Sequence, residues 1–137
     1  GAISLGNELV TGMDVETVKE KVDGSVKKMD LDKTRCFNFY KVNFKDGDVT
    51  YIAINENTEK LTYKLVFFDV EKRSKLENYL EEKCGEPVDA RNTLFYYHGD
   101  IGYKVTSYSD EALQLWVGSV SLWDEAAEDT SFNEFEK

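Results

Sequence analysis

Hydrophobic side chains recur at helical spacing in one long segment, residues 69–87. Asp69 is a residue type that caps helix N-termini, and Gly85 with Pro87 behind it is a typical helix end. The apolar positions that share one face of the segment are Leu76, Tyr79, Leu80 and Cys84. This spacing of three and four residues predicts an amphipathic helix whose apolar face packs on another element.

A second, shorter helix is predicted directly after residue 14. Asp14 can cap its first turn, and Gly24 follows it as a stop. Its apolar face consists of Val15, Val18 and Val22. Because valine is a poor helix former, tertiary packing must hold this helix. Residues 25–32 have no pattern that assigns them to a helix or a strand.

From residue 35 onward the apolar positions alternate with a period of two, which is typical of half-buried strands. The predicted strands are 35–44, 49–55, 60–68, 93–97, 101–108 and 113–123. The side chains expected on one face of the third strand are Leu61, Tyr63, Leu65 and Phe67, with Thr62 and Lys64 on the other. In the last strand the alternation changes phase at Gly118, which predicts a bulge or kink there.

The order of the predicted elements is helix, three strands, helix, three strands. It predicts an α+β fold, a two-layer sandwich in which two helices cover one face of a mostly antiparallel six-stranded sheet. The repeated order suggests an α-βββ duplication. We expect one domain over residues 1–123, with an arm over 1–12, followed by an acidic tail over 124–137.

Charge and hydropathy exclude two classes of partner. The formal net charge of −10 argues against nucleic acid, which is bound by clustered Lys and Arg. No apolar run approaches the roughly 18 residues of a membrane-spanning helix, although a lipid anchor upstream of residue 1 is compatible with the sequence. Gly-rich phosphate loops are absent, so no cofactor is predicted.

The two cysteines, Cys36 and Cys84, exclude a scaffold of several disulfides. They leave one bridge between them or two buried thiols, and Cys84 fits equally well as a small core residue of the long helix.

Candidate catalytic and metal-binding residues do not form a recognisable arrangement. His98 is the only histidine, so no transition-metal spacing exists and no metal site is predicted. Asp100 could orient His98 as a base, but no nucleophile is implied by spacing. Residues 30–34, Asp-Leu-Asp-Lys-Thr, match a phosphotransferase nucleophile loop by letter but lack the buried strand that precedes such loops. No catalytic residue is predicted.

Aromatic side chains are the remaining candidates for binding. The residues expected on the sheet face opposite the helices are Trp116, Trp123, Tyr108, Phe37 and Phe39. Aromatic side chains on a polar sheet suit a flat contact with a protein or a sugar ring. The alternative is that the tail or the arm covers them.

The segment Gly12-Met13-Asp14, which leads into the spaced valines, and the helix end Gly85-Glu86-Pro87 carry a resemblance. With the order of elements, they make the chain similar to small exported bacterial domains of the β-lactamase-inhibitor-protein and BamE type. Asp14 stands where that group has a hydroxyl residue. The resemblance implies an exported protein, in the periplasm, at the cell surface or secreted, that binds other proteins through its sheet. It assigns no functional residue.

Three hypotheses of function follow. The first is a non-catalytic module of an exported bacterial protein that binds a protein partner through the aromatic sheet face. The second is a small-molecule or glycan-binding domain with a concave pocket lined by those aromatic side chains. The third, a hydrolase, would require His98 or a pair of carboxylates to converge in a cleft.

Overall fold

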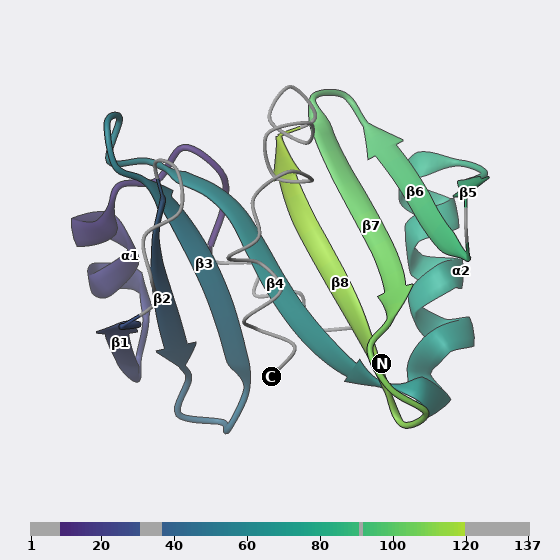
Figure 1. Cartoon of the computed structure of the whole chain (residues 1–137), viewed down its shortest axis with the longest axis horizontal. Helices are drawn as coiled ribbons and strands as arrows, with labels where there is room; N and C mark the ends of the chain where they lie inside the picture. The colour runs from purple at the N-terminus through teal and green to yellow at the C-terminus, as the bar shows by residue number, and fades with distance from the viewer. Residues whose placement is uncertain (1–8, 31–36, 91, 120–137) are drawn as a thin grey trace.

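The computed structural model describes residues 9–30, 37–90 and 92–119. Within them lies one antiparallel sheet of eight strands, in the order β1-β2-β3-β4-β8-β7-β6-β5 (Figure 1). The strands are β1 (Ser25–Lys28), β2 (Phe37–Asn43), β3 (Val49–Asn55), β4 (Leu61–Asp69), β5 (Val88–Ala90), β6 (Thr93–His98), β7 (Ile101–Ser107) and β8 (Ala112–Ser119). Two α-helices accompany the sheet, α1 (Val15–Lys21) and α2 (Arg73–Cys84).

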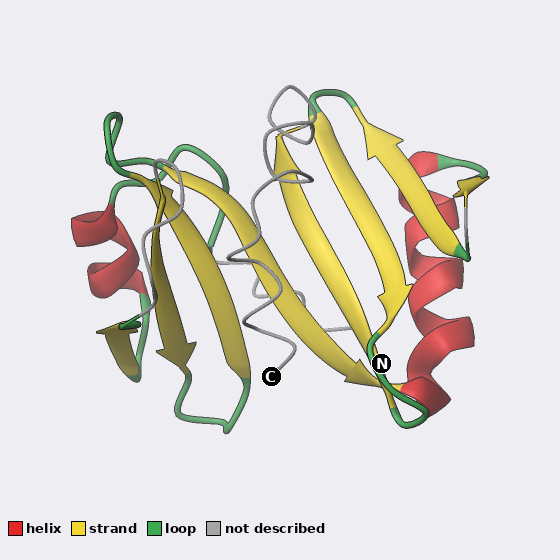
Figure 2. Cartoon of the chain, in the orientation of Figure 1, coloured by secondary structure: helices red, strands yellow, loops and turns green. Residues whose placement is uncertain are grey.

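The predicted two-layer sandwich with a six-stranded sheet is therefore wrong. The described chain forms one sheet of eight strands, and its two short helices lie toward the outer sides of that sheet (Figure 2). The strands that the sequence did not reveal are β1 and β5. Both lie at a sheet edge and are almost entirely exposed, so they lack the alternation of apolar and polar residues that marks a half-buried strand.

The sheet divides into two halves of the same order. Each half consists of a helix followed by four antiparallel strands, α1 with β1 to β4 and α2 with β5 to β8. The halves meet at the centre of the sheet, where β4 pairs antiparallel with β8 from Tyr63↔Gly118 to Asp69↔Ala112 (Figure 1). Each unit thus has four strands and not the three of the predicted α-βββ duplication.

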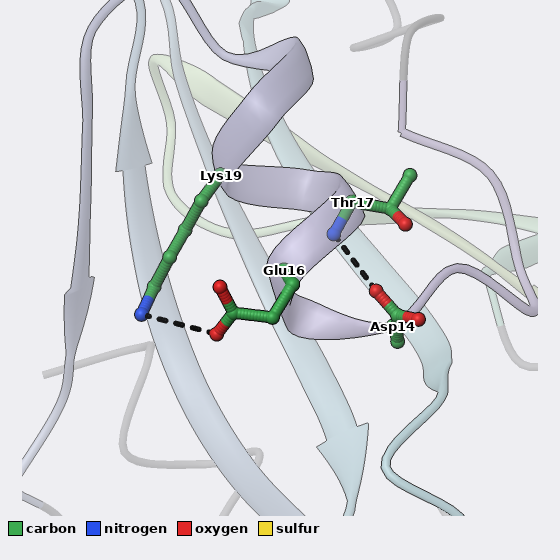
Figure 3. A network of polar contacts seen from close by, with 4 residues as sticks. All are labelled: Asp14, Glu16, Thr17 and Lys19. Carbon is green, nitrogen blue, oxygen red and sulfur yellow. Dashed lines mark hydrogen bonds and ion pairs between the residues drawn. The ribbon is translucent and has the colours of Figure 1, made fainter.

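The first helix begins as its sequence predicts. The Oδ1 atom of Asp14 accepts a hydrogen bond of 2.8 Å from the amide of Thr17, which confirms the predicted cap (Figure 3). Lys19 forms an exposed ion pair with Glu16 one turn away, with a 3.8 Å separation between Nζ and Oε1. Val18 is fully buried and anchors the helix to the sheet.

The second helix begins later than predicted and ends where predicted. Asp69 is the last residue of β4 and makes no side-chain capping bond, and a 3₁₀ turn (Val70–Lys72) precedes α2. Gly85 ends the helix with a φ of +86°, and its amide donates to the carbonyl of Glu81. Leu76 and Leu80 are fully buried, so the predicted apolar face is confirmed.

Strand register assigns the core side chains to two faces. One face carries the cluster around α1 and the cluster around α2, and the opposite face carries a third, aromatic cluster. The third cluster consists of Phe37, Phe39, Ala53, Tyr63, Leu65 and Trp116. We call the face with the α1 and α2 clusters the helix-side face and the face with the third cluster the aromatic face.

A register shift in the pairing of β3 with β4 lies between Ala53 and Ile54. It places Leu61 on the helix-side face, whereas Tyr63 belongs to the aromatic cluster, so the prediction that both share one face is wrong. At Gly118, in contrast, β8 pairs in continuous register with β4 and β7, so the predicted bulge does not occur at this residue. Glycine is required there for another reason, because a Cβ atom would collide with the ring of Tyr63.

Candidate functional site

The predicted binding aromatics are mostly buried. Phe37 and Phe39 are each 3% exposed and Trp116 is 9% exposed, and all three belong to the aromatic cluster. Tyr108 is 37% exposed. Trp123 lies outside the described residues. The structure thus brings Phe37, Phe39 and Trp116 together, as predicted for one sheet face, but leaves little of their surface to a partner.

A row of three rings on the aromatic face is more accessible. Phe67 is at its centre, and its ring centroid lies 5.9 Å from that of Tyr51 and 5.1 Å from that of Tyr108. Both contacts are edge-to-face, with interplanar angles of 82° and 78°. Tyr51 and Phe67 are half-buried. We call Tyr51, Phe67 and Tyr108 the ring row.

Lysine side chains share the face with the ring row. Lys41 is the cross-strand partner of Tyr51, and Lys27 is that of Lys41. Lys104 pairs with Trp116 across β7 and β8, and its ammonium group lies 5.8 Å from the centroid of that indole. Among the described strand residues of this face the one carboxylate is that of Asp69, at the end of β4. The described strand residues of this face thus carry three lysines against one aspartate, although the chain has a net charge of −10.

The opposite, helix-side face contains a pocket of about 370 Å³. The described residues that line it come from the arm, β4, α2, β7 and β8, and are Leu9, Val10, Thr11, Leu61, Lys64, Tyr79, Lys83, Ile101, Tyr103 and Val117. Two lysines, two tyrosines and Thr11 supply its polar side chains, and these lining residues include no aspartate or glutamate. We call it the lysine pocket.

Lys64 is the most unusual residue of the pocket. Its side chain projects from the central strand β4, and the residue is only 7% exposed. Its ammonium group donates a hydrogen bond of 3.0 Å to the backbone carbonyl of Leu9. Burial, and secondarily the positive charge of Lys83, lower the pKa of Lys64 from 10.5 to about 8.

Tyr103 of β7 lies beside Lys83 in the pocket. The ammonium group of Lys83 lies 5.9 Å from the centroid of the Tyr103 ring. Burial raises the pKa of the Tyr103 hydroxyl, and the neighbouring Lys83 offsets part of that rise. The hydroxyl is therefore neutral near pH 7 and can donate a hydrogen bond to an anion in the pocket.

The sequence pattern did not indicate this pocket. The alternation put Lys64 on the face of β4 opposite Leu61 and Tyr63, and gave no sign that both faces of the strand are buried. The available signal was the run from Leu61 to Phe68, which is almost continuously apolar and therefore typical of a strand covered on both sides. A lysine inside such a run is either buried or displaces the register.

The remaining candidates of the sequence do not converge. His98 is exposed at the end of β6, and Asp100 beside it is exposed in the following turn. Asp30 is exposed, and residues 31–34 of the same motif lie outside the described part of the chain. In the described residues no group of three His, Cys, Asp or Glu side chains could hold a metal ion.

Cys84 is half-buried and forms no disulfide with another described residue, and burial raises the pKa of its thiol. Its predicted partner Cys36 lies outside the described residues, so the bridge between them stays a prediction.

The chain has no match among known protein families, curated proteins or solved structures. Within residues 9–30, 37–90 and 92–119, no helix has the length and apolar character needed to cross a membrane.

Proposed function

We propose that this protein is a non-catalytic binding module whose aromatic face takes a partner protein with an acidic surface. The observation that carries the proposal is the ring row beside Lys41 and Lys104 on one face of an otherwise acidic chain. Tyrosine is enriched among the residues that dominate binding energy, because a rigid ring buries much area and loses little entropy. Lysines around such rings attract a partner of opposite charge and orient it.

The buried aromatics have a different role in this proposal. Phe37 packs against Phe39 and, edge-to-face, against Tyr63, so these rings fix the shape of the sheet under the binding surface. The indole ring of Trp116 packs against the ammonium group of Lys104. The side chains that contact the partner are therefore Tyr51, Phe67 and Tyr108, and of these only Tyr108 was chosen from sequence.

From the resemblance alone, we also propose that the protein is exported and acts in the periplasm, at the cell surface or outside the cell. A lipid anchor upstream is part of that proposal. The Gly12-Met13-Asp14 segment that leads into α1 supports it.

A capture experiment tests the proposed surface. The immobilised chain is exposed to envelope and secreted proteins of the source organism, beside a Lys41→Glu, Lys104→Glu variant and a Tyr108→Ala variant. The matched control is Lys19→Glu, Lys72→Glu, which reverses the same number of charges at exposed positions near the two helices. A saturable partner should bind the wild type and the control and be lost from both aromatic-face variants. Equal capture by all four proteins would refute the proposal.

Small-molecule binding is the second candidate function, and the lysine pocket is the observation that favours it. It lies on the helix-side face, so both functions could operate in one molecule.

A further inference from the structure

We propose that the lysine pocket binds an organic carboxylate, with the carboxylate between the ammonium groups of Lys64 and Lys83 and an apolar portion against the aliphatic lining. This site is independent of the aromatic face and of the function proposed for it. The ligand class is a small monoanion with a hydrophobic body, such as an aryl or alkyl carboxylic acid.

The charge of the pocket is the first argument. Lys64 approaches from the central strand and is buried, whereas Lys83 approaches from the last turn of α2 and is exposed at the rim. The two positive charges are close enough that Lys83 disfavours the protonated form of Lys64. Bringing an anion between them replaces that repulsion with two charge-assisted hydrogen bonds in a poorly solvated site.

The apolar lining is the second argument, because it selects among anions. Leu61, Ile101 and Val117 lie on three neighbouring parts of the wall, and the rings of Tyr79 and Tyr103 add two flat surfaces. A volume of about 370 Å³ lies within the range of small-molecule sites, and the lining combines polar with apolar side chains. Inorganic phosphate could not use this lining, whereas a carboxylate with a hydrophobic body could.

The third argument is that hydrogen bonds fix the arm to the sheet where it lines the pocket. The amide of Gly12 donates to the carbonyl of Leu61 at 2.9 Å, and the amide of Leu61 donates to the carbonyl of Met13 at 2.6 Å. Leu9 is fully buried in the cluster around α1, and its carbonyl accepts the hydrogen bond from Lys64. The pocket is thus held in shape on the arm side, which lowers the entropic cost of binding.

Three compounds of one skeleton test the proposal. The probes are 4-phenylbutyrate, 4-phenylbutan-1-ol and 4-phenylbutylamine, which share a hydrophobic body and differ in the charge of one end. Each is titrated at pH 7 into the full chain, and the shifts of backbone amide resonances are followed. The same titrations are made with Lys83→Met, Lys64→Met and the control Lys72→Met, which removes an exposed lysine that does not line the pocket.

We expect 4-phenylbutyrate to bind in the millimolar range or tighter and to shift the amides of Leu9, Lys64 and Lys83. The alcohol should bind about tenfold more weakly, which is the loss expected for a hydrogen bond to a charged group, and the amine should not bind. Lys83→Met and Lys64→Met should each lower the affinity for 4-phenylbutyrate by about tenfold or more, and Lys72→Met should leave it unchanged. Since methionine suits a buried position, Lys64→Met should still fold, and Lys83 is exposed in any case.

Several results would overturn the proposal. They are absence of saturable shifts with 4-phenylbutyrate, equal affinity for the alcohol, unchanged affinity in Lys83→Met, or shifts that lie on the aromatic face. Tighter binding of inorganic phosphate than of 4-phenylbutyrate would also overturn it, because the apolar lining would then contribute nothing. None of these results bears on the capture experiment, so failure here is distinguishable from failure of the proposed function.

Discussion

The ammonium group of Lys64 donates a hydrogen bond of 3.0 Å to the carbonyl oxygen of Leu9, 55 positions earlier in the chain. This bond ties the arm to the central strand of the sheet and gives a buried cation a polar partner. Burying a charged amine is costly even so, which is why its pKa falls to about 8. The cation at the base of the lysine pocket is therefore held at the expense of stability.

A first prediction concerns the pH dependence of stability. The pKa of Lys64 is about 8 in the folded chain and 10.5 when exposed, so between these values the unfolded chain binds more protons. The free energy of unfolding should therefore rise with pH, and this one group should add about 2 kcal/mol between pH 8 and pH 10. Urea unfolding of wild type and Lys64→Met across this range measures the difference between the two proteins.

Lys64→Met removes the titrating group, so its stability should lack that rise. The urea titrations should not extend above about pH 10. Burial raises the pKa of Tyr96 from 10 to about 12, so above pH 10 the tyrosine ionises in the unfolded chain first and lowers the free energy of unfolding. Parallel curves for the two proteins between pH 8 and pH 10 would show that Lys64 is not buried as a cation.

A second prediction concerns the contact between Gly118 and Tyr63. Gly118→Ala places a Cβ atom against the Tyr63 ring and close to the Thr62 carbonyl, so it should destabilise the protein by about 1–3 kcal/mol. Thermal unfolding of Gly118→Ala, Tyr63→Leu and the double variant tests the cause. The smaller leucine should relieve part of the clash. The double variant should therefore lose less stability than the sum of the losses in the two single variants. Strict additivity would mean that the ring is not what requires glycine.

A third prediction concerns the packing of α2. Leu80 is fully buried in the α2 cluster, so Leu80→Ala should lower the free energy of unfolding by about 3 kcal/mol. Val88 on the edge strand β5 is 57% exposed, and Val88→Ala should change it by less than about 0.5 kcal/mol. Denaturant titration compares the two. Similar losses would mean that the helix does not rest on the sheet through Leu80.

A fourth prediction concerns the cap of α1. Hydrogen bonds from Thr17 hold the pKa of Asp14 below its usual value, so its stabilising effect is present at neutral pH and is lost as the pH falls through that lowered pKa. Asp14→Ala should lower the melting temperature at pH 7, and Asp14→Asn should preserve most of it because asparagine also caps. A melting temperature at pH 7 that is the same for Asp14→Ala and wild type would contradict the role of the cap.

Sequence predicted the six inner strands and both helices because each of them buries a patterned face. Val18 and Leu80 are examples of positions where periodicity and burial agree. The edge strands β1 and β5 could not be predicted in this way, because they are almost entirely exposed and their residues obey no alternation. Without them, the four-stranded halves and their meeting at β4 and β8 could not be derived.

The candidate sites were predicted less well, and the reason lies in β4. Both of its faces are buried, so alternation could not show which side chains lie under the helices and which lie on the aromatic face. The alternation placed Lys64 and Phe67 on opposite faces but did not show that Lys64 is buried. The aromatic residues Phe37, Phe39 and Trp116 were grouped on one face correctly, but their burial depends on packing that sequence spacing does not encode.

The most direct test of the proposed function is the salt dependence of affinity for the captured partner. Dissociation constants are measured at about 50 and 300 mM salt for the wild type, for Lys41→Glu, Lys104→Glu and for the control Lys19→Glu, Lys72→Glu. Wild type and control should bind alike and weaken as salt screens the lysines, and the aromatic-face variant should bind about tenfold more weakly or worse at low salt. An affinity that is indifferent to salt and equal in all three proteins would contradict the assignment of the aromatic face as the binding surface.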